Sequence, residues 1–215
     1  MPPYPRNHIP AYIGIAGTII MAISDVILLS VPAAGWETDM ASFSSLAHVS
    51  LLRMTIGPLL GLASSFFICF GFWYIKEKLS HLDARLAMVL FISYSSMMVY
   101  GGAFHAGYYF AGHALYAGDT ALYHAFISQL EIMSGLSIPG LLLGTGIYIY
   151  LLQSKANGFP KWLKFANFLV IQGLFLGVFM ILPSPVGGII KPTFVNLATL
   201  VFFIVNLNVK EKPLN

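Results

Sequence analysis

Six long apolar stretches dominate the sequence and constrain what this chain can fold into. They cover approximately residues 10–33, 50–75, 86–111, 123–152, 165–183 and 190–209, and short polar connections separate them. A helix needs roughly 20 apolar residues to cross about 30 Å of hydrocarbon, which matches the length of each stretch. Transmembrane β-barrels have shorter segments that alternate in polarity. We therefore predict an all-α fold, a single polytopic domain of six transmembrane helices.

The composition excludes the main classes of soluble protein. Only 9% of the 215 residues are charged, whereas 58% are hydrophobic. A soluble domain carries roughly 25% charged residues, so this chain has too few charges to cover a soluble surface. Soluble enzymes and nucleic-acid-binding proteins are excluded, and the lipid bilayer is the expected partner. The single cysteine, Cys69, rules out an intramolecular disulfide and a cysteine-based metal site.

The basic residues predict the orientation of the helices. Nine of the eleven lysines and arginines fall on one side of the predicted membrane: Arg6, Lys76, Lys78, Arg85, Lys155, Lys161, Lys164, Lys210 and Lys212. Cytoplasmic loops carry an excess of lysine and arginine, so this side is expected to be cytoplasmic. Both termini are then predicted to lie in the cytoplasm, with three connections outside.

Four ionisable residues interrupt the first four apolar stretches. They are Asp25, Arg53, His105 and Glu131, one in each stretch. A rise of 1.5 Å per residue places all four in the outer half of the bilayer, and the cytoplasmic half holds nothing comparable. Ionisable side chains are costly in hydrocarbon and need a partner or a cavity. We expect a shared pocket, open to the outside, that binds a small amphipathic or lipid-like molecule.

Helical spacing suggests which side chains share this pocket. A carboxylate beside an imidazole can act as an acid–base pair, so His105 and Glu131 are the candidate catalytic residues. Asp25 and Arg53 are candidates to orient the substrate or stabilise charge, and an ion pair between them is the alternative. The candidate substrate-binding residues, which include side chains on the stripes of the third and fourth helices, are Asp25, Arg53, Tyr109, Ser128 and His113.

Several alternatives remain open at this stage. The four charges are also consistent with structural ion pairs that only fix the order of the helices. Zn²⁺ held by Asp25, His105 and Glu131 is a further alternative, although no two ligands share a helix at the usual spacing. A substrate-capturing or transport subunit and an accessory subunit of a membrane complex compete with an enzyme. Gln172 and Asn196 are expected to form hydrogen bonds between helices rather than to bind a ligand.

Short motifs in the first half of the chain resemble a known group of proteins. They are Gly14 with Ser24-Asp25, Arg53 with Gly57, and the glycine-rich run from Gly101 through His105 to Gly107. The combination is similar to an uncharacterised bacterial membrane-protein family, which has a glycine-rich first helix ending in Asp and a Gly-Gly-x-x-His element. The likeness covers roughly the first 110 residues. It implies a location in the bacterial inner membrane and no particular chemistry.

Overall fold

Helices are the only regular secondary structure in the part of the chain that the structure describes. This computed structural model describes residues 7–30, 46, 49–153, 158–183 and 186–211. The α-helices are α1 (Ile9–Leu29), α2 (Leu51–Leu79), α3 (Ala84–Tyr116), α4 (Thr120–Gln153), α5 (Phe168–Met180), α6 (Val186–Ile190) and α7 (Phe194–Asn208). Two 3-10 helices, η2 (Lys161–Phe165) and η3 (Lys191–Thr193), lie between them. The prediction of an all-α fold is confirmed for these residues.

Helices α1 to α4 are each long and apolar enough to cross a membrane. They coincide with the first four predicted stretches, apart from residues 31–33, which lie outside the described residues. Helix α3 begins cleanly because the Asp83 side chain accepts hydrogen bonds from the backbone N–H groups of Arg85 and Leu86. With 33 and 34 residues, α3 and α4 are each about 50 Å long and exceed the hydrocarbon thickness of about 30 Å.

The last two predicted stretches form shorter helices. Helix α5 has 13 residues, about 20 Å, and starts where the Asn167 side chain accepts from the N–H of Val170. The final stretch is divided into α6, η3 and the 15-residue α7, with Pro192 at the start of η3. Proline removes a backbone donor and interrupts a regular helix. The last two predicted stretches thus contain three shorter helices, α5, α6 and α7, whereas the first four form the helices that are long enough to cross a membrane.

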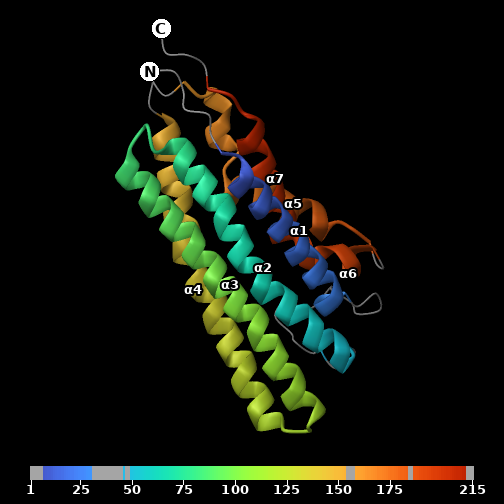
Figure 1. The fold of residues 1–215 in the computed structure, drawn as a ribbon. Helices are drawn as coiled ribbons and strands as arrows, with labels where there is room; N and C mark the ends of the chain where they lie inside the picture. The colour runs from blue at the N-terminus through green and yellow to red at the C-terminus, as the bar shows by residue number, and fades with distance from the viewer. Residues whose placement is uncertain (1–6, 31–45, 47–48, 154–157, 184–185, 212–215) are drawn as a thin grey trace.

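The long helices pack side by side in the order α1, α2, α3, α4, and α7 covers α1 while α5 packs on α7 (Figure 1). Glycine allows these close approaches. A Cβ atom at Gly14 of α1 would overlap the backbone of Gly71 on α2. A Cβ at Gly107 of α3 would lie 2.5 Å from Cδ2 of Leu130 on α4. Small residues at such positions let helix backbones approach closely in a membrane protein.

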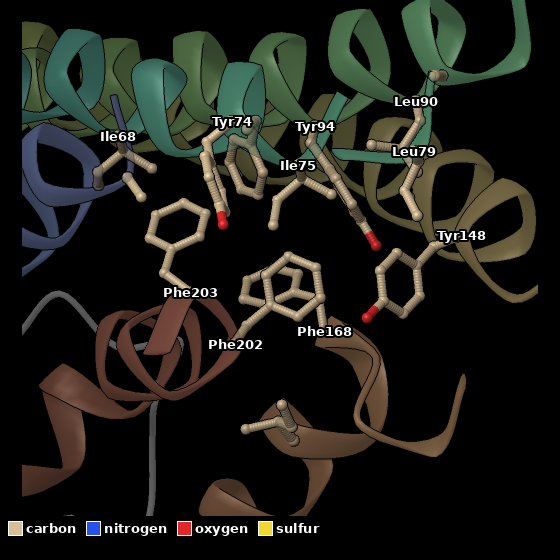
Figure 2. Close-up of a cluster of buried hydrophobic side chains, with 14 of the residues drawn as sticks. Ile68, Tyr74, Ile75, Leu79, Leu90, Tyr94, Tyr148, Phe168, Phe202 and Phe203 are labelled. Carbon is tan, nitrogen blue, oxygen red and sulfur yellow. The ribbon is translucent and has the colours of Figure 1, made fainter. Parts of the chain in front are cut away.

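An aromatic cluster joins five helices (Figure 2). The Phe202 ring of α7 lies 5.3 Å from that of Tyr148, and 6.0 Å from those of Tyr94 and Phe168. Phe72 of α2 completes the cluster, 4.9 Å from Tyr94. Aromatic rings packed at these separations contribute more than their buried area alone. The cluster attaches α5 and α7 to the long helices α2, α3 and α4.

Several connections meet at one end of the bundle. The buried Lys78 ammonium donates to the carbonyl oxygens of Asn206 and Val209, the latter at 2.7 Å, at the end of α7. The His8 ring contacts Tyr74, and the His81 ring contacts Phe159. The start of α1, the α2–α3 connection, the approach to η2 and the end of α7 therefore share this end. We call it the basic end, because the described residues near these connections include Lys76, Lys78, Arg85, Lys161, Lys164 and Lys210.

Candidate functional site

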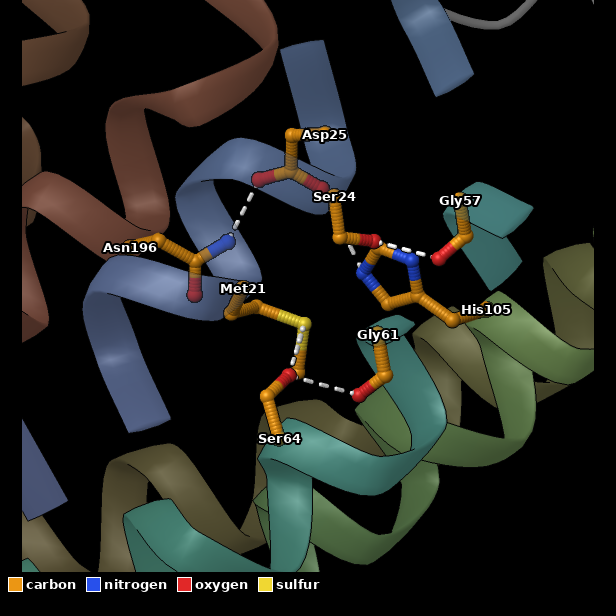
Figure 3. A network of polar contacts seen from close by, with 8 residues as sticks. All are labelled: Met21, Ser24, Asp25, Gly57, Gly61, Ser64, His105 and Asn196. Carbon is orange, nitrogen blue, oxygen red and sulfur yellow. Dashed lines mark hydrogen bonds and ion pairs between the residues drawn. The ribbon is translucent and has the colours of Figure 1, made fainter. Parts of the chain in front are cut away.

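Three helices bring a carboxylate, an imidazole and an amide together inside the bundle (Figure 3). His105 Nε2 of α3 lies 3.4 Å from Asp25 Oδ1 of α1. Asn196 Nδ2 of α7 donates to the other carboxylate oxygen, Oδ2, at 2.5 Å. Asp25, His105 and Asn196 are only 3%, 7% and 6% exposed. We call these three residues the Asp25 cluster.

Glycine on α2 makes room for the imidazole ring. A Cβ atom at Gly61 would lie 2.5 Å from both Cγ and Nδ1 of His105. The ring therefore lies directly against the α2 backbone, in space that any other residue would occupy. One turn away, the Ser24 hydroxyl donates to the Gly57 carbonyl at 2.6 Å and joins α1 to α2 beside the ring. Two glycines four residues apart thus form the α2 wall of the site.

One ring nitrogen of His105 distinguishes this site. Nδ1 of His105 is buried and has no hydrogen-bond partner among the residues that the structure describes. If the imidazole proton is on Nε2, which faces Asp25, Nδ1 is an acceptor without a donor. Most buried polar atoms in proteins are hydrogen-bonded, so an exception calls for an explanation. This atom is the feature of the Asp25 cluster that is not explained by packing.

The alternative of an ion pair between Asp25 and Arg53 is wrong. Arg53 Nε donates to the Ile27 carbonyl at 2.5 Å, and Nη2 donates to the Ser30 carbonyl at 2.6 Å and to the Ser30 hydroxyl at 3.1 Å. The last carbonyls of a helix lack intrahelical donors, and α1 ends at Leu29. Arg53 therefore caps the C-terminal end of α1. A cation there also interacts favourably with the helix dipole.

The expected pairing of His105 with Glu131 is also wrong. Leu130 is the residue of α4 that packs against Gly107 of α3 and is fully buried. Successive residues of a helix are 100° apart, so Glu131 points away from this contact and is exposed. Ser128 is exposed on α4 as well. Neither residue belongs to the Asp25 cluster, although Glu131 lies at about the same level of the bundle.

Tyr109 and His113 form a separate pair on α3, beyond His105. Their ring centroids are 4.1 Å apart, and His113 Nδ1 lies 2.8 Å from the Tyr109 carbonyl. Both residues are half-buried. No hydrogen bond or ion pair in the described structure links this pair to Asp25 or His105. The predicted stripe on α3 is real, but only His105 contacts the carboxylate.

The proposed zinc ligands do not converge. Asp25 and His105 are neighbours, but Glu131 lies on the exposed side of α4. Among the residues that the structure describes, no three His, Cys, Asp or Glu side chains come together in a way that could hold a metal ion. A catalytic zinc site needs three protein ligands, so the set Asp25, His105 and Glu131 does not form one.

Sequence reasoning missed the contributions of Asn196 and Gly61. Asn196 was expected to form a hydrogen bond between helices, and this is confirmed, but its partner is the carboxylate of the site. The other amide, Gln172, has a buried Oε1 without a partner in the described part of the chain. Gly61 lies four residues after Gly57 and one turn closer to the basic end of the bundle. Its spacing of four from Gly57 was the available signal of a close helix contact.

Comparison with known proteins identifies the family. The chain belongs to a family of unknown function, DUF6796, whose model matches residues 5–212. The match confirms the expectation of an uncharacterised family and extends it from the first half to nearly the whole chain. No curated protein and no solved structure matches the chain.

Proposed function

We propose that this member of the DUF6796 family is a multi-pass membrane protein that binds a small amphipathic molecule at the Asp25 cluster. The observation that carries the proposal is Nδ1 of His105, which is buried and has no hydrogen-bond partner among the described residues. Leaving a buried polar atom unpaired costs roughly 1–3 kcal/mol, which a ligand hydroxyl would offset, because a hydroxyl can donate to Nδ1 or accept from it. An ionisable residue inside a membrane-spanning helix is, by default, a candidate functional residue.

The pair of Asp25 and His105 suits such a ligand because it is electrically balanced. One proton shared between the two side chains gives either carboxylate with imidazolium or carboxylic acid with imidazole, and both states are neutral overall. The pair can therefore stay in a low-dielectric environment without an uncompensated charge. It can also give a proton to a bound molecule or take one from it, as a general acid or base. In this proposal Asp25, and not Glu131, is the carboxylate that acts together with His105.

The position of the cluster favours entry from the end opposite the basic end. Asp25 follows the start of α1 by 16 residues, about 24 Å, and precedes the end of α1 by only four. A polar head group would reach the cluster from the nearer membrane surface, and an apolar tail would remain in the bilayer. A substrate-capturing subunit for a small solute would use the same site. An enzyme would convert the bound molecule chemically, whereas a substrate-capturing subunit would release it unchanged.

A purely structural role is the second candidate, and Asn196 favours it. The Asn196 amide donates a hydrogen bond to one oxygen of the Asp25 carboxylate, and all three side chains of the Asp25 cluster are buried. A satisfied polar cluster of this kind can fix the order of helices without binding anything. In that case the unpartnered Nδ1 is a tolerated cost.

Native mass spectrometry of the full-length protein distinguishes the two roles. We expect the wild type in mild detergent to carry a co-purifying small molecule, and His105→Gln and Asp25→Asn to lose it at unchanged folding. Both substitutions keep shape and hydrogen-bonding capacity while they remove the shared proton. Glu131→Gln is the matched control and should retain the molecule, because Glu131 is exposed and outside the cluster. If His105→Gln retained the same molecule, the binding proposal would be refuted and the structural role would remain as the explanation of the cluster.

We also propose that the chain crosses a bacterial inner membrane six times with both termini in the cytoplasm. The excess of lysine and arginine at the basic end supports this orientation. Reporter fusions after residues 80 and 158 should report the cytoplasm, and fusions after residues 118 and 187 the outside. The fusion after residue 187 tests whether the short α5 crosses. A cytoplasmic signal there would reduce the six crossings to four.

A further inference from the structure

The surface of α4 differs from the surfaces of the other long helices. The exposed large side chains in the middle of α1, α2 and α3 are apolar, as contact with lipid requires; they include Ile19, Ile23, Leu59, Phe66, Ile92 and Val99. Helix α4 also exposes apolar side chains, such as Ile132 and Leu136. In addition it exposes Ser128, Gln129 and Glu131 within one turn. The contact of Leu130 with Gly107 puts these residues at nearly the level of His105, within the predicted membrane span. Polar side chains at that level need a partner other than lipid.

Three of the four residues at the centre of the exposed surface are small. Taking the buried Leu130 as the direction of α3, and 100° per residue, the opposite side of α4 carries Ala125, Ser128, Ile132 and Gly135. We call these four residues the outward face of α4. A Cβ at Gly135 would have nothing within 4 Å, whereas Gly14, Gly61 and Gly107 each contact another helix. The outward face thus resembles the packed faces of this protein, but no other helix among the described residues packs on Gly135.

We propose that two copies of this chain associate through the outward face of α4. The reason is that the face is self-complementary. Gln129 and Glu131 flank it on opposite sides, at about 100° before and after Leu130. Two parallel copies related by a two-fold axis along the membrane normal place opposite flanks together, so Glu131 of one copy lies beside Gln129 of its partner. The two residues differ by about 3 Å in height, which the side chains can span.

The pairing satisfies groups that the single chain leaves open. Neither the Gln129 side chain nor the Glu131 side chain has a hydrogen bond or ion pair with another described residue of its own chain. In the two-fold arrangement the Gln129 amide donates to the Glu131 carboxyl, and the pair occurs twice because the interface is isologous. Small residues at Ser128 and Gly135 let the helices approach closely enough for these bonds.

A glycine substitution tests the interface without disturbing the monomer. Gly135→Leu should weaken dimerisation about tenfold or more in lipid nanodiscs, as measured by native mass spectrometry over a range of protein-to-lipid ratios. The monomer fold should persist, since the added side chain meets open space. Gly173→Leu on α5 is the matched control, because Gly173 also has nothing within 4 Å and is exposed. It should leave the dimer unchanged.

Cysteine cross-linking gives an independent test of the same face. In a Cys69→Ser background, Ser128→Cys should form a disulfide-linked dimer in membranes under mild oxidation, whereas Leu59→Cys on the lipid-facing side of α2 should not. Equal cross-linking at the two positions would overturn the proposal, as would a wild-type protein that stays monomeric at every ratio. A dimer that survives Gly135→Leu and is lost in Gly173→Leu would place the interface on α5 and also overturn it.

Discussion

Replacing Gly61 by alanine is expected to destabilise the protein by about 1–3 kcal/mol, the usual cost of overpacking a well-packed interior. The new Cβ would lie 2.5 Å from Cγ and Nδ1 of His105, atoms too close to the α3 backbone to swing away. The ring would have to leave its position beside Asp25, so the binding site should be lost together with stability. Unfolding in detergent, followed by thermal or denaturant melts, measures the first effect.

Two further variants isolate the cause. Gly101→Ala, on the same bundle, introduces a Cβ that meets nothing within 4 Å and should be neutral or slightly stabilising. Gly61→Ala combined with His105→Ala should cost less than the sum of the two single changes, because removal of the ring frees the space for the new methyl group. Additive losses, or equal melting temperatures for Gly61→Ala and Gly101→Ala, would refute the close contact between α2 and the imidazole.

Asn196→Leu is expected to cost about 2 kcal/mol, since it removes a buried hydrogen bond to a carboxylate and leaves Oδ2 of Asp25 unpaired. The loss should be much smaller in an Asp25→Asn background, where no charge remains to be solvated. Such a double-mutant cycle, read from the same melts, measures the coupling between α1 and α7 directly.

A residue on the same helix serves as the control for this cycle. Asn208 is exposed and bonds only to the Ile204 carbonyl of its own helix, so Asn208→Leu should change stability by less than about 0.5 kcal/mol. If Asn196→Leu costs the same with Asp25 present and absent, the amide does not support the carboxylate. The Asp25 cluster would then consist of Asp25 and His105 alone.

Much of the fold was predictable because helix length follows from the number of apolar residues. The four stretches that became α1 to α4 were each long enough to cross a membrane, and the described structure agrees. The last two stretches were predicted less well. Both stretches are apolar on average, but each contains a residue that sets a helix boundary whatever the surrounding hydropathy. Asn167 caps the start of α5, and Pro192 lies at the start of η3.

The candidate site was predicted only in part. Asp25 and His105 were correctly expected at similar depth and on inward faces, and they do meet. The partners considered for both were wrong, since these were Arg53 for Asp25 and Glu131 for His105, each on the next helix along the chain. Adjacent helices do pack together here, but α1 also contacts α7, which supplies Asn196 from 171 residues away.

The sequence by itself determined that this chain is helical and apolar, and approximately how far along each helix every polar residue lies. Depth is a one-dimensional quantity that follows from a constant rise per residue. Only the tertiary structure decided which polar residues face one another, because facing depends on how each helix is rotated about its axis. That rotation is fixed by contacts such as Gly61 with His105 and Gly107 with Leu130, where a side chain of one helix packs directly against a glycine of the next. Packing between distant segments, and not the local sequence, therefore put Asp25 beside His105 and left Glu131 outside.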